Sequence, residues 1–539
     1  MGTLALIVTA LPVAVPDAYV EAVADEPPLL NPILAPYTQA GQDVLPLVFA
    51  GLVRADAEGT LVPDLAERWT VSDDGRDYTV TLRSGLRWHD GEPLTAEDVQ
   101  FTIRLVQAPD HQGSQDLAEL WRGVEVEVFD PTTVRFRLPS PLASFAEHLT
   151  LGLLPRHSLD SVAASALPLH PFNRAPVGSG PYRGAAVEPD RIVLERYADY
   201  HGPPPRLARI ELRAFASRPE AVDALLAGTV DGLGNLRADE VRRLDVERDV
   251  SVYSLPERSK VALLAMNVQG QILDRRPVRQ AIARAIDRDR LIRDAAGGQA
   301  EPAFGPIPIQ SWSFGGGTVA APYDPDAASA LLDEDGWKRA LSGKRERDGT
   351  ALAVSLLTPD TADRLALARE LARQLGEVGI EVTLRPVPPD ELVDNYLQPR
   401  HYQLALVGQW TMGSDPDVYP QWHSSQVGRP GGNYTGFANL EVDRWLEQGR
   451  QETHREARRT AYLNFQARWA EEQPSVVLFH PLYSFAVARE VRGVAADPLP
   501  DSSWRLRDAT GWYRVATPTR LQTMRSWIVE RAPALDVRP

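Results

Sequence analysis

The block from residue 69 to residue 105 has the clearest pattern of hydrophobic and polar positions in the chain. Tyr78, Val80 and Leu82 alternate with polar residues, and a period of two is typical of a strand with one buried face. The Asp and Gly residues at 72–75 predict a turn before this strand, because Asp bonds its own backbone and Gly accepts positive φ. The block therefore begins with a turn and a half-buried strand.

The second half of the same block predicts a helix. Thr95 and Asp98 have the three-residue spacing of a capping box, in which each side chain accepts a hydrogen bond from the other residue's backbone. The apolar residues Val99, Phe101 and Leu105 follow directly after it. We therefore expect a helix from residue 95 to residue 105.

Similar patterns recur along the rest of the chain. Alternating or continuous apolar runs predict strands at 19–23, 124–128, 134–138, from 192 onwards, and at 210–215, 261–268, 380–384, 403–407 and 476–479. Apolar stripes of helical period predict helices at 43–52, 219–227, 277–286, 325–336 and 365–378. The charged stretch 338–348 is expected to be a solvated loop. The alternation of strands and helices predicts an α/β protein with ligand chemistry at the ends of strands.

The length of 539 residues is too great for a single hydrophobic core. A prior of about 150 residues per domain predicts three or four structural units. Hydrophobic residues make up 43% of the chain and charged residues 24%, which is ordinary for a folded globular protein. A multi-lobed protein that folds fully is therefore expected.

Charge and cysteine content exclude several classes of partner and site. The formal net charge is −16, and this disfavours nucleic acids and anionic membrane surfaces, which bind basic faces. The chain has no cysteine, which excludes disulfides, thiolate metal sites and cysteine nucleophiles. It also excludes anchoring through a lipidated N-terminal cysteine.

The N-terminal residues 1–18 contain the apolar run Thr3–Val15. This run is shorter than the roughly 20 residues of a membrane-spanning helix, Pro12 interrupts it, and no Lys or Arg precedes it. We expect residues 1–18 to be either a tail or the remnant of an export or anchor segment whose start is truncated.

A search for catalytic motifs finds none of the common ones. The P-loop, H-E-x-x-H and G-x-S-x-G patterns are absent, and His residues are scattered singly. The Gly-rich stretch 177–182 does not resemble a phosphate loop, because no helix opens after it and Pro181 lacks a backbone donor. We therefore expect no catalytic residue, no metal and no cofactor.

Asp415 and Asp417 form the best candidate for a ligand site. They follow the predicted strand 403–407 and Trp410, so they would lie at a strand end that faces an interlobe crevice. A carboxylate there attracts a ligand amine by about 4 kcal/mol at 4 Å and an effective dielectric of 20, less the desolvation cost. The alternative is that these acids only cap an Asp-Pro turn, and the pattern leaves both possibilities open.

The block at 69–105 also resembles the signature of a known family. The phrases 82–83, 88–91 (WHDG) and 95–99 (TAEDV) are similar to the signature of bacterial extracellular solute-binding proteins, family 5, which serve ABC importers of peptides and nickel. Further phrases of that family occur in the same order, at 30–32, 63–69, 178–182, 277–282, 286–288, 323–337, 415–417, 433–434 and 474–481. The resemblance covers about residues 19–515.

This resemblance implies a type II periplasmic-binding-protein fold: an α/β protein of two lobes joined by two crossing strands, with an extra inserted α+β domain. The implied boundaries are 19–52, 177–264 and 482–539 for lobe I, 53–176 for the inserted domain, and 265–481 for lobe II. The crossing strands would be 261–268 and 476–479, and they would act as the hinge.

The same resemblance implies a function. The chain would be the monomeric, extracytoplasmic binding component of an ABC importer, capturing a peptide or similar small solute by hinge closure and delivering it to the permease subunits. Besides Trp410, Asp415 and Asp417, the candidate ligand contacts are the aromatic and amide residues Tyr37, Trp312, Trp422, Asn433 and Tyr434, for each of which packing is an equal alternative. Peptide-binding members usually carry an acid about three residues after the Trp, whereas this chain has Met412-Gly413-Ser414.

Two other functions stay open from the sequence. A secreted hydrolase of peptides or glycans would need a carboxylate pair in a cleft, about 5 to 9.5 Å apart for glycans. A sensor or chaperone-like binder would share the fold without transporting its ligand.

Overall fold

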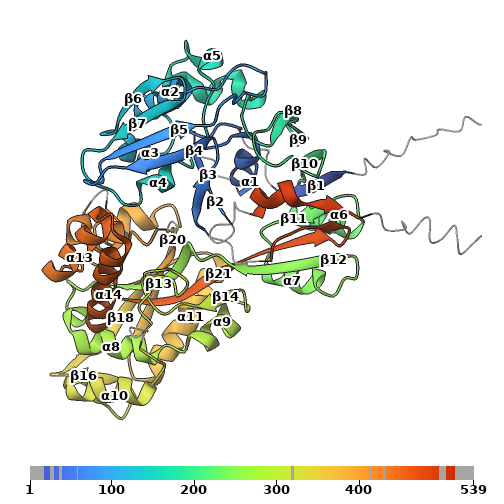
Figure 1. Cartoon of the computed structure of the whole chain (residues 1–539). Coiled ribbons are helices and arrows are strands. Elements are labelled where there is room, and N and C mark those ends of the chain that lie inside the picture. Colours follow the sequence, from blue (N-terminus) through green and yellow to red (C-terminus); the bar gives the residue numbers. More distant parts are fainter. Residues whose placement is uncertain are drawn as a thin grey trace, which may run out of the picture.

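The computed structural model describes residues 17–24, 29–34, 39–56, 59–316, 321–411, 415–428, 431–496 and 505–515. Three regions are visible in it (Figure 1). The inserted domain lies at the upper left, lobe II at the lower left and lobe I at the right. We define each region by its elements below, and the residue boundaries implied by the family resemblance stay a prediction.

Lobe I is built on a mixed sheet whose path runs β11-β1-β10-β9-β8. Its strands are β1 (Ala18–Val23), β8 (Tyr182–Glu188), β9 (Arg191–Arg196), β10 (Arg209–Ala214), β11 (Gly232–Leu233), β12 (Val250–Pro256) and the second half of β21 (Ser475–Ala488). Its helices are α1 (Gln39–Val48), α6 (Arg218–Leu226), α7 (Ala238–Leu244) and the 3-10 helix η7 (Arg507–Gly511). Two small antiparallel pairs complete it: the hairpin of β2 (Val53–Ala55) with β3 (Leu61–Pro63), and the pair of β22 (Val491–Arg492) with β23 (Tyr513–Arg514).

The inserted domain is an antiparallel sheet in the order β4-β5-β7-β6. Its strands are β4 (Ala66–Val71), β5 (Asp77–Leu82), β6 (Glu125–Asp130) and β7 (Thr133–Arg137). Its helices are α2 (Ala96–Gln107), α3 (Gln115–Trp121), α4 (Phe145–His148), α5 (Arg156–Leu159), η1 (Ala164–Leu169) and η2 (Pro171–Arg174).

Lobe II has a sheet in the order β19-β18-β20-β13-β21 with helices packed on it (Figure 1). Its strands are β13 (Lys260–Met266), β14 (Ala300–Pro302), β15 (Lys338–Arg339), β16 (Arg345–Arg347), β17 (Thr350–Ala351), β18 (Ala353–Pro359), β19 (Glu381–Val387), β20 (Leu404–Thr411) and the first half of β21. Its helices are η3 (Ile272–Asp274), α8 (Arg276–Ala285), α9 (Arg288–Ala295), α10 (Pro325–Glu334), α11 (Ala362–Glu377), η4 (Leu392–Leu397), α12 (Tyr419–Trp422), η5 (Ser424–Gln426), α13 (Leu440–Gln451) and α14 (Arg455–Glu472).

The two lobes meet at two strand crossings. β21 is one strand of 14 residues, and it pairs with β13 and β14 in lobe II and then with β12 and β11 in lobe I. β12 and β13 are separated by residues 257–259 only. Hydrogen bonds join the two crossings to each other. The Glu257 backbone N–H donates to the Pro481 carbonyl (2.9 Å), and His480 Nδ1 donates to the Lys260 carbonyl (2.8 Å).

The hydrophobic cores show which regions form one body. One continuous cluster joins the inserted domain, through Trp88 and Phe145, to lobe I, through Tyr19, Phe485 and Trp512. Lobe II has separate clusters on the two faces of its sheet. Since a shared core resists separation, the inserted domain moves with lobe I, and lobe II is the part that can move against them.

Most elements predicted from periodicity are confirmed. In β5, Tyr78, Val80 and Leu82 are buried and alternate with partly exposed residues. The capping box of α2 is present, with Thr95 N donating to the Asp98 carboxylate at 2.8 Å. The predicted crossing strand at 476–479 lies within the longer strand β21.

Two local predictions are wrong. Helix α1 spans Gln39–Val48 and does not extend to residue 52 as predicted, because the Val48 carbonyl accepts hydrogen bonds from the backbone of Ser179 (3.1 Å) and Gly180 (2.8 Å). The stretch 338–348 is not a plain loop, since β15 and β16 pair within it. Arg345 in β16 is buried and donates to the Val378 and Trp337 carbonyls, and these distant partners give the charged run its structure.

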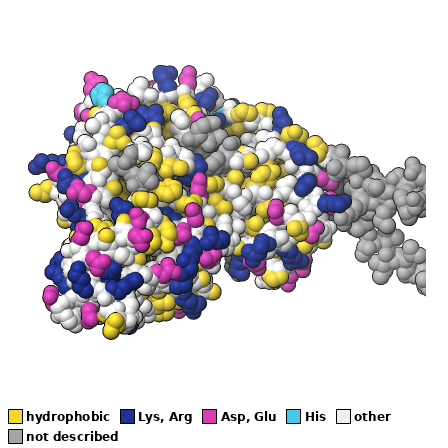
Figure 2. All heavy atoms as spheres, turned by 90° about the horizontal axis from the view of Figure 1, so that it is seen from below, with side chains coloured by type: hydrophobic (Ala, Val, Ile, Leu, Met, Phe, Trp, Pro, Cys, Tyr) yellow, Lys and Arg dark blue, Asp and Glu magenta, His cyan; other side chains and the backbone are white. Residues whose placement is uncertain are grey.

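No helix in the described ranges combines the length and apolarity that a membrane crossing requires. On the face of the molecule seen in Figure 2, basic and acidic side chains are interspersed and are not gathered by sign.

Candidate ligand-binding site

The candidate site lies where strand β20 ends. Trp410 is opposite Val261 in the register of β20 with β13, which places its backbone beside the first crossing. The Trp410 side chain and residues 412–414 lie outside the described part of the chain, as does Tyr37. The predicted ligand contacts of Trp410 and Tyr37 therefore stay predictions.

Asp415 is held by an arginine that the sequence analysis missed. Its Oδ1 accepts a hydrogen bond from Arg458 Nη2 at 2.5 Å, and Arg458 Nε donates to the Gly449 carbonyl at 2.7 Å. Arg458 is buried and the Asp415 side chain is 12% exposed, and burial raises the pKa of Asp415 although Arg458 acts in the opposite direction. Asp415 thus already has a cationic partner in this structure.

Asp417 has its own arginine. Its Oδ2 accepts from Arg450 Nε at 2.9 Å, and its Oδ1 accepts from the Tyr419 backbone N–H at 3.2 Å, just where α12 begins. The Arg450 guanidinium also lies 4.1 Å from the centre of the Tyr419 ring, a cation–π contact. Asp417 therefore bonds an arginine and the backbone of its own turn, and its contact with a ligand stays a prediction.

Trp312 contacts two arginines of α14, one of which is Arg458, the partner of Asp415. Its ring centre lies 5.0 Å from the Arg455 guanidinium and 5.2 Å from that of Arg458, and Tyr462 packs edge-on against it with ring centres 6.2 Å apart. Arg458 therefore bridges Trp312 and Asp415. One signal was available in the sequence, because Arg455 and Arg458 are three residues apart and share one face of a helix.

Trp422, Asn433 and Tyr434 form a separate group within the core of lobe II. Trp422 is fully buried and packs edge-on against Trp469. Asn433 donates to the carbonyls of His423 (3.1 Å) and Phe437 (2.8 Å), as a loop-anchoring amide does. Tyr434 packs against the same core, and its carbonyl accepts from Tyr402. Their contact with a ligand also stays a prediction.

The inserted domain forms hydrogen bonds directly with Arg450 and Asp415. The Ala143 backbone N–H donates to the Arg450 carbonyl at 2.8 Å, and the Asp415 backbone N–H donates to the Glu147 carboxylate. A cavity of about 330 Å³ lies between the domain and lobe II, lined by Leu142 and Phe145 on one side and by Tyr419 and Arg450 on the other. The contact is therefore polar and incompletely packed.

Two titratable groups of the inserted domain respond to this contact. Burial lowers the pKa of His148 from its ordinary 6.5 to about 4; Arg450 adds to this, whereas Asp417 opposes it. Burial likewise raises the pKa of Tyr78 to about 12. The Arg458 guanidinium acts to lower this pKa, and the Asp415 carboxylate acts to raise it. Both groups are neutral at pH 7, so the side chains that carry charge at this contact are arginines and carboxylates.

Metal binding has no candidate site in the described ranges, because no three His, Asp or Glu side chains there lie close enough to share an ion.

Comparisons with known proteins place the chain in a family. The family model for "Bacterial extracellular solute-binding proteins, family 5 Middle" matches residues 60–430. The oligopeptide-binding protein AppA of Bacillus subtilis is 27% identical over 486 residues, which are 88% of this chain and 88% of AppA. A probable di/tripeptide-binding protein of Pseudomonas aeruginosa is 31% identical over 505 residues, which are 86% of this chain and 89% of that protein.

A solved structure agrees with these relatives. The crystal structure of B. subtilis AppA with a nonapeptide superposes with a TM-score of 0.70 at 25% identity, covering 93% of this chain and 99% of that one. The fold is thus that of the type II periplasmic binding proteins, as predicted. The relatives are binding proteins by name, and they give no support to the hydrolase alternative. Because the family model covers well over half of its residues, the chain belongs to the bacterial extracellular solute-binding proteins, family 5.

Proposed function

We propose that this protein binds a peptide or peptide-like solute between lobe I and lobe II and delivers it to the permease of an ABC importer. The observation that carries the proposal is the arrangement of the cores: lobe II has cores of its own, and two strand crossings connect it to lobe I. Such an arrangement supports rotation of lobe II about the crossings, which opens and closes the space between the lobes.

The class of ligand is proposed from the relatives. Their names state oligopeptide or di/tripeptide binding, and one structure contains a nonapeptide. Asp415, at the end of β20, is the proposed partner of the ligand's ammonium group. Since Arg458 already bonds Asp415, the ammonium would have to share that carboxylate, and we expect a moderate contribution from it.

The cellular setting is part of the same proposal. The family is described as extracellular, and we propose that the protein works as a monomer outside the cytoplasm with permease subunits as its partners. A ligand that binds the closed form more tightly shifts the population towards it. The closed form would then present lobe I, the inserted domain and lobe II to the permease in one fixed arrangement.

The direct test is to identify a bound ligand. Native mass spectrometry of the purified protein should detect a co-purified peptide, and a library from dipeptides to nonapeptides should raise the melting temperature. A ligand at 100 times its Kd stabilises the protein by about 2.7 kcal/mol, which a thermal scan resolves. A protein that carries nothing small and shows no shift with any peptide would contradict the proposal.

The role of Asp415 has a separate test. Asp415→Asn should weaken peptides with a free amino group more than the same peptides with an acetylated one. Asp160→Asn in the inserted domain is the matched control, because Asp160 is exposed and pairs with Arg104 far from β20. Equal weakening of both peptide forms would remove Asp415 as the ammonium partner.

A further inference from the structure

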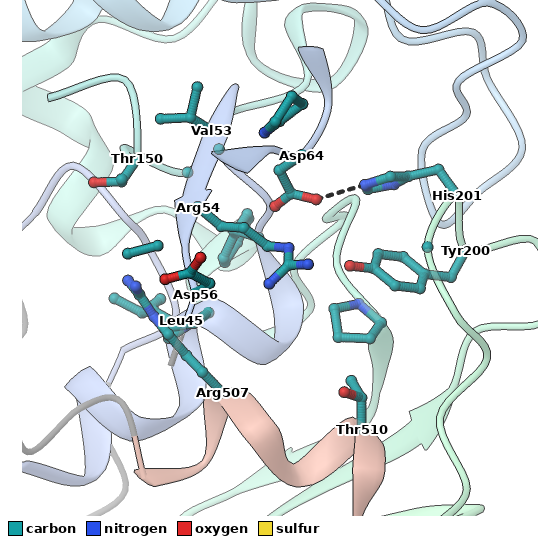
Figure 3. Close-up of a pocket in the computed structure, with 18 of the residues that line it drawn as sticks. Leu45, Val53, Arg54, Asp56, Asp64, Thr150, Tyr200, His201, Arg507 and Thr510 are labelled. Atoms are coloured by element: carbon teal, nitrogen blue, oxygen red, sulfur yellow. Dashed lines mark hydrogen bonds and ion pairs between the residues drawn. The ribbon is translucent and has the colours of Figure 1, made fainter. Parts of the chain in front are cut away.

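A second cavity lies away from lobe II, at the junction of lobe I and the inserted domain. Its volume is about 500 Å³, within the range of small-molecule sites. Its walls come from helix α1, the β2–β3 hairpin, the loops 150–152 and 200–203, and η7 (Figure 3). None of the lining residues belongs to lobe II, so rotation of lobe II leaves the walls of this cavity in place.

The walls are built by close backbone packing. A Cβ placed on Gly51 would lie 2.6 Å from the Thr150 carbonyl oxygen, and one placed on Gly152 would lie 2.7 Å from the Phe49 Cβ. No side chain fits at either glycine without a shift of its surroundings. The loop at 150–152 is therefore locked against α1 and β2, and the cavity is a formed feature of the fold.

Arg54 occupies the centre of this cavity (Figure 3). Arg54 lies in β2 between the buried residues Val53 and Ala55. Because side chains alternate along a strand, the exposed Arg54 side chain projects from the opposite face of the hairpin. Within the described ranges, the Arg54 guanidinium makes no hydrogen bond and no ion pair. An exposed guanidinium in a formed cavity, with no fixed partner, is able to bind an anion through charge-assisted hydrogen bonds.

The nearby carboxylates have other partners. Asp64 bonds His201 Nε2 at 2.7 Å (Figure 3). Asp56 accepts the Thr60 backbone N–H at 2.8 Å within the hairpin turn. Arg83, Arg507 and Asp508 also line the cavity, so its three arginines are matched by three carboxylates, and Arg54 is the arginine at its centre. Burial raises the pKa of Tyr200, so its hydroxyl is neutral at pH 7 and able to donate a hydrogen bond.

Part of the lining is apolar. Leu45, Pro46 and Phe49 of α1 and the following turn, together with Pro32 and Pro203, supply this surface. An apolar surface beside a guanidinium fits a molecule that has an anionic head and a hydrophobic body. An inorganic anion would leave this surface in contact with water.

We propose that this cavity is a second binding site, for a small organic oxyanion: a carboxylate or phosphate group on an apolar or aromatic body. Arg54 binds the oxyanion through two parallel N–H donors, a geometry that the planar guanidinium offers and lysine does not. The Tyr200 hydroxyl and Arg507 lie on either side of Arg54, and Phe49 packs against the body of the ligand. The site works independently of peptide binding between the lobes.

The test uses benzoate, phenyl phosphate and benzamidine as probes in calorimetric titrations of the full chain. We expect benzoate or phenyl phosphate to bind and benzamidine, which has the same ring and a positive charge, not to bind. The stronger of the two anions identifies the head group. Arg54→Gln should weaken the anions about tenfold or more, because it removes the charged donor pair.

Arg68→Gln is the matched control, since Arg68 is an exposed arginine of the inserted domain with only a long contact to Glu67. It should leave anion binding unchanged, and circular dichroism checks that both variants are folded. Three results would overturn the proposal: no binding of either anion at millimolar concentration, equal binding by the Arg54→Gln protein, or displacement of the anion by a saturating peptide. The first two of these results can be obtained even if no peptide ligand is found.

Discussion

Two arginine–carboxylate networks in this protein differ in where they lie relative to the movable lobe. In lobe I, Arg505 Nη2 bonds both Glu21 (2.8 Å) and Asp43 (2.9 Å), and these three side chains are 1%, 2% and 5% exposed. In lobe II, Arg458 and Asp415 are 8% and 12% exposed and lie against the inserted domain. One network is enclosed within a single body, and the other lies at a boundary between two bodies.

The difference in place implies a difference in role. The lobe I network joins β1 and α1 to the C-terminal segment, and none of these separates when lobe II moves. Its charged side chains are almost fully buried in the folded state, so each depends mainly on its partners. The lobe II network gains contact with water when lobe II moves away from the inserted domain. The stabilisation that this ion pair provides can therefore differ between the open and closed forms.

The largest expected effect is on the enclosed network. Arg505→Met leaves Glu21 and Asp43 buried without their cation, and we expect a loss of about 4 kcal/mol in the free energy of unfolding, measured by urea denaturation. Because Nη2 bonds both acids while Nε and Nη1 have no hydrogen-bond partner among the described residues, Arg505→Lys should recover part of the loss. A loss below about 1 kcal/mol for Arg505→Met would show that the acids are hydrated after all.

The boundary network should be less sensitive. Arg458→Met leaves Asp415 without its cation, but water can reach this carboxylate, and we expect a loss of about 2 to 3 kcal/mol by the same measurement. Adding Asp415→Asn removes the uncompensated charge and should restore at least half of that loss. If Arg458→Met costs as much as Arg505→Met and the second substitution restores nothing, the distinction between the two networks is wrong.

The pH dependence of the closed contact follows from His148. Its pKa is lowered to about 4 by burial in this structure. We expect opening to hydrate the imidazole and to raise this pKa towards 6.5, so that protonation favours the open form. The closed contact is fully stable above pH 6.5 and weakens as the pH falls from 6.5 to 4, by at most about 3 kcal/mol.

A distance measurement checks this dependence. The chain has no cysteine, so Leu169→Cys in the inserted domain and Leu341→Cys in lobe II, both exposed, can carry a fluorescent donor and acceptor. Energy transfer should fall between pH 6.5 and 4 and should stay nearly constant in the His148→Gln protein. A parallel fall in both proteins would assign the dependence to other groups, of which Asp415 is the nearest candidate because its pKa is raised.

The smallest effect is expected for an exposed pair. Arg104 and Asp160 are 3.1 Å apart with more than half of each side chain exposed. Asp160→Ala should change the free energy of unfolding by less than about 0.5 kcal/mol, and high salt should remove the difference. A larger loss would mean that the exposure of an ion pair does not predict its contribution to the free energy of unfolding in this protein.

Local patterns in the sequence were sufficient for most elements and insufficient for the candidate site. The alternation around Tyr78 and the cap at Thr95 depend on neighbouring residues, and both are confirmed. The partners of Asp415 and Asp417 are not neighbours: Arg458 is 43 residues away and Arg450 is 33. Periodicity reports which face of an element is buried, but it contains no information about which distant residue meets that face.

The same limit explains the short strands at 338–351. Their structure depends on Arg345, whose partners lie on other elements, so a charged run of this kind predicts a loop. The order of motifs along the chain indicated the overall architecture more reliably than any single element did, because that order is a property of the whole fold.

Strand β21 has a further consequence, for the order in which the protein folds. It lies between β11 and β13 in the continuous sheet and pairs with residues more than 200 positions earlier in the chain. Until residues 475–488 are available, β11 and β13 both have an unpaired edge, and neither lobe can complete its sheet. Contacts at such long sequence separation form slowly. The two lobes should therefore finish folding together, after nearly all of the chain has been made.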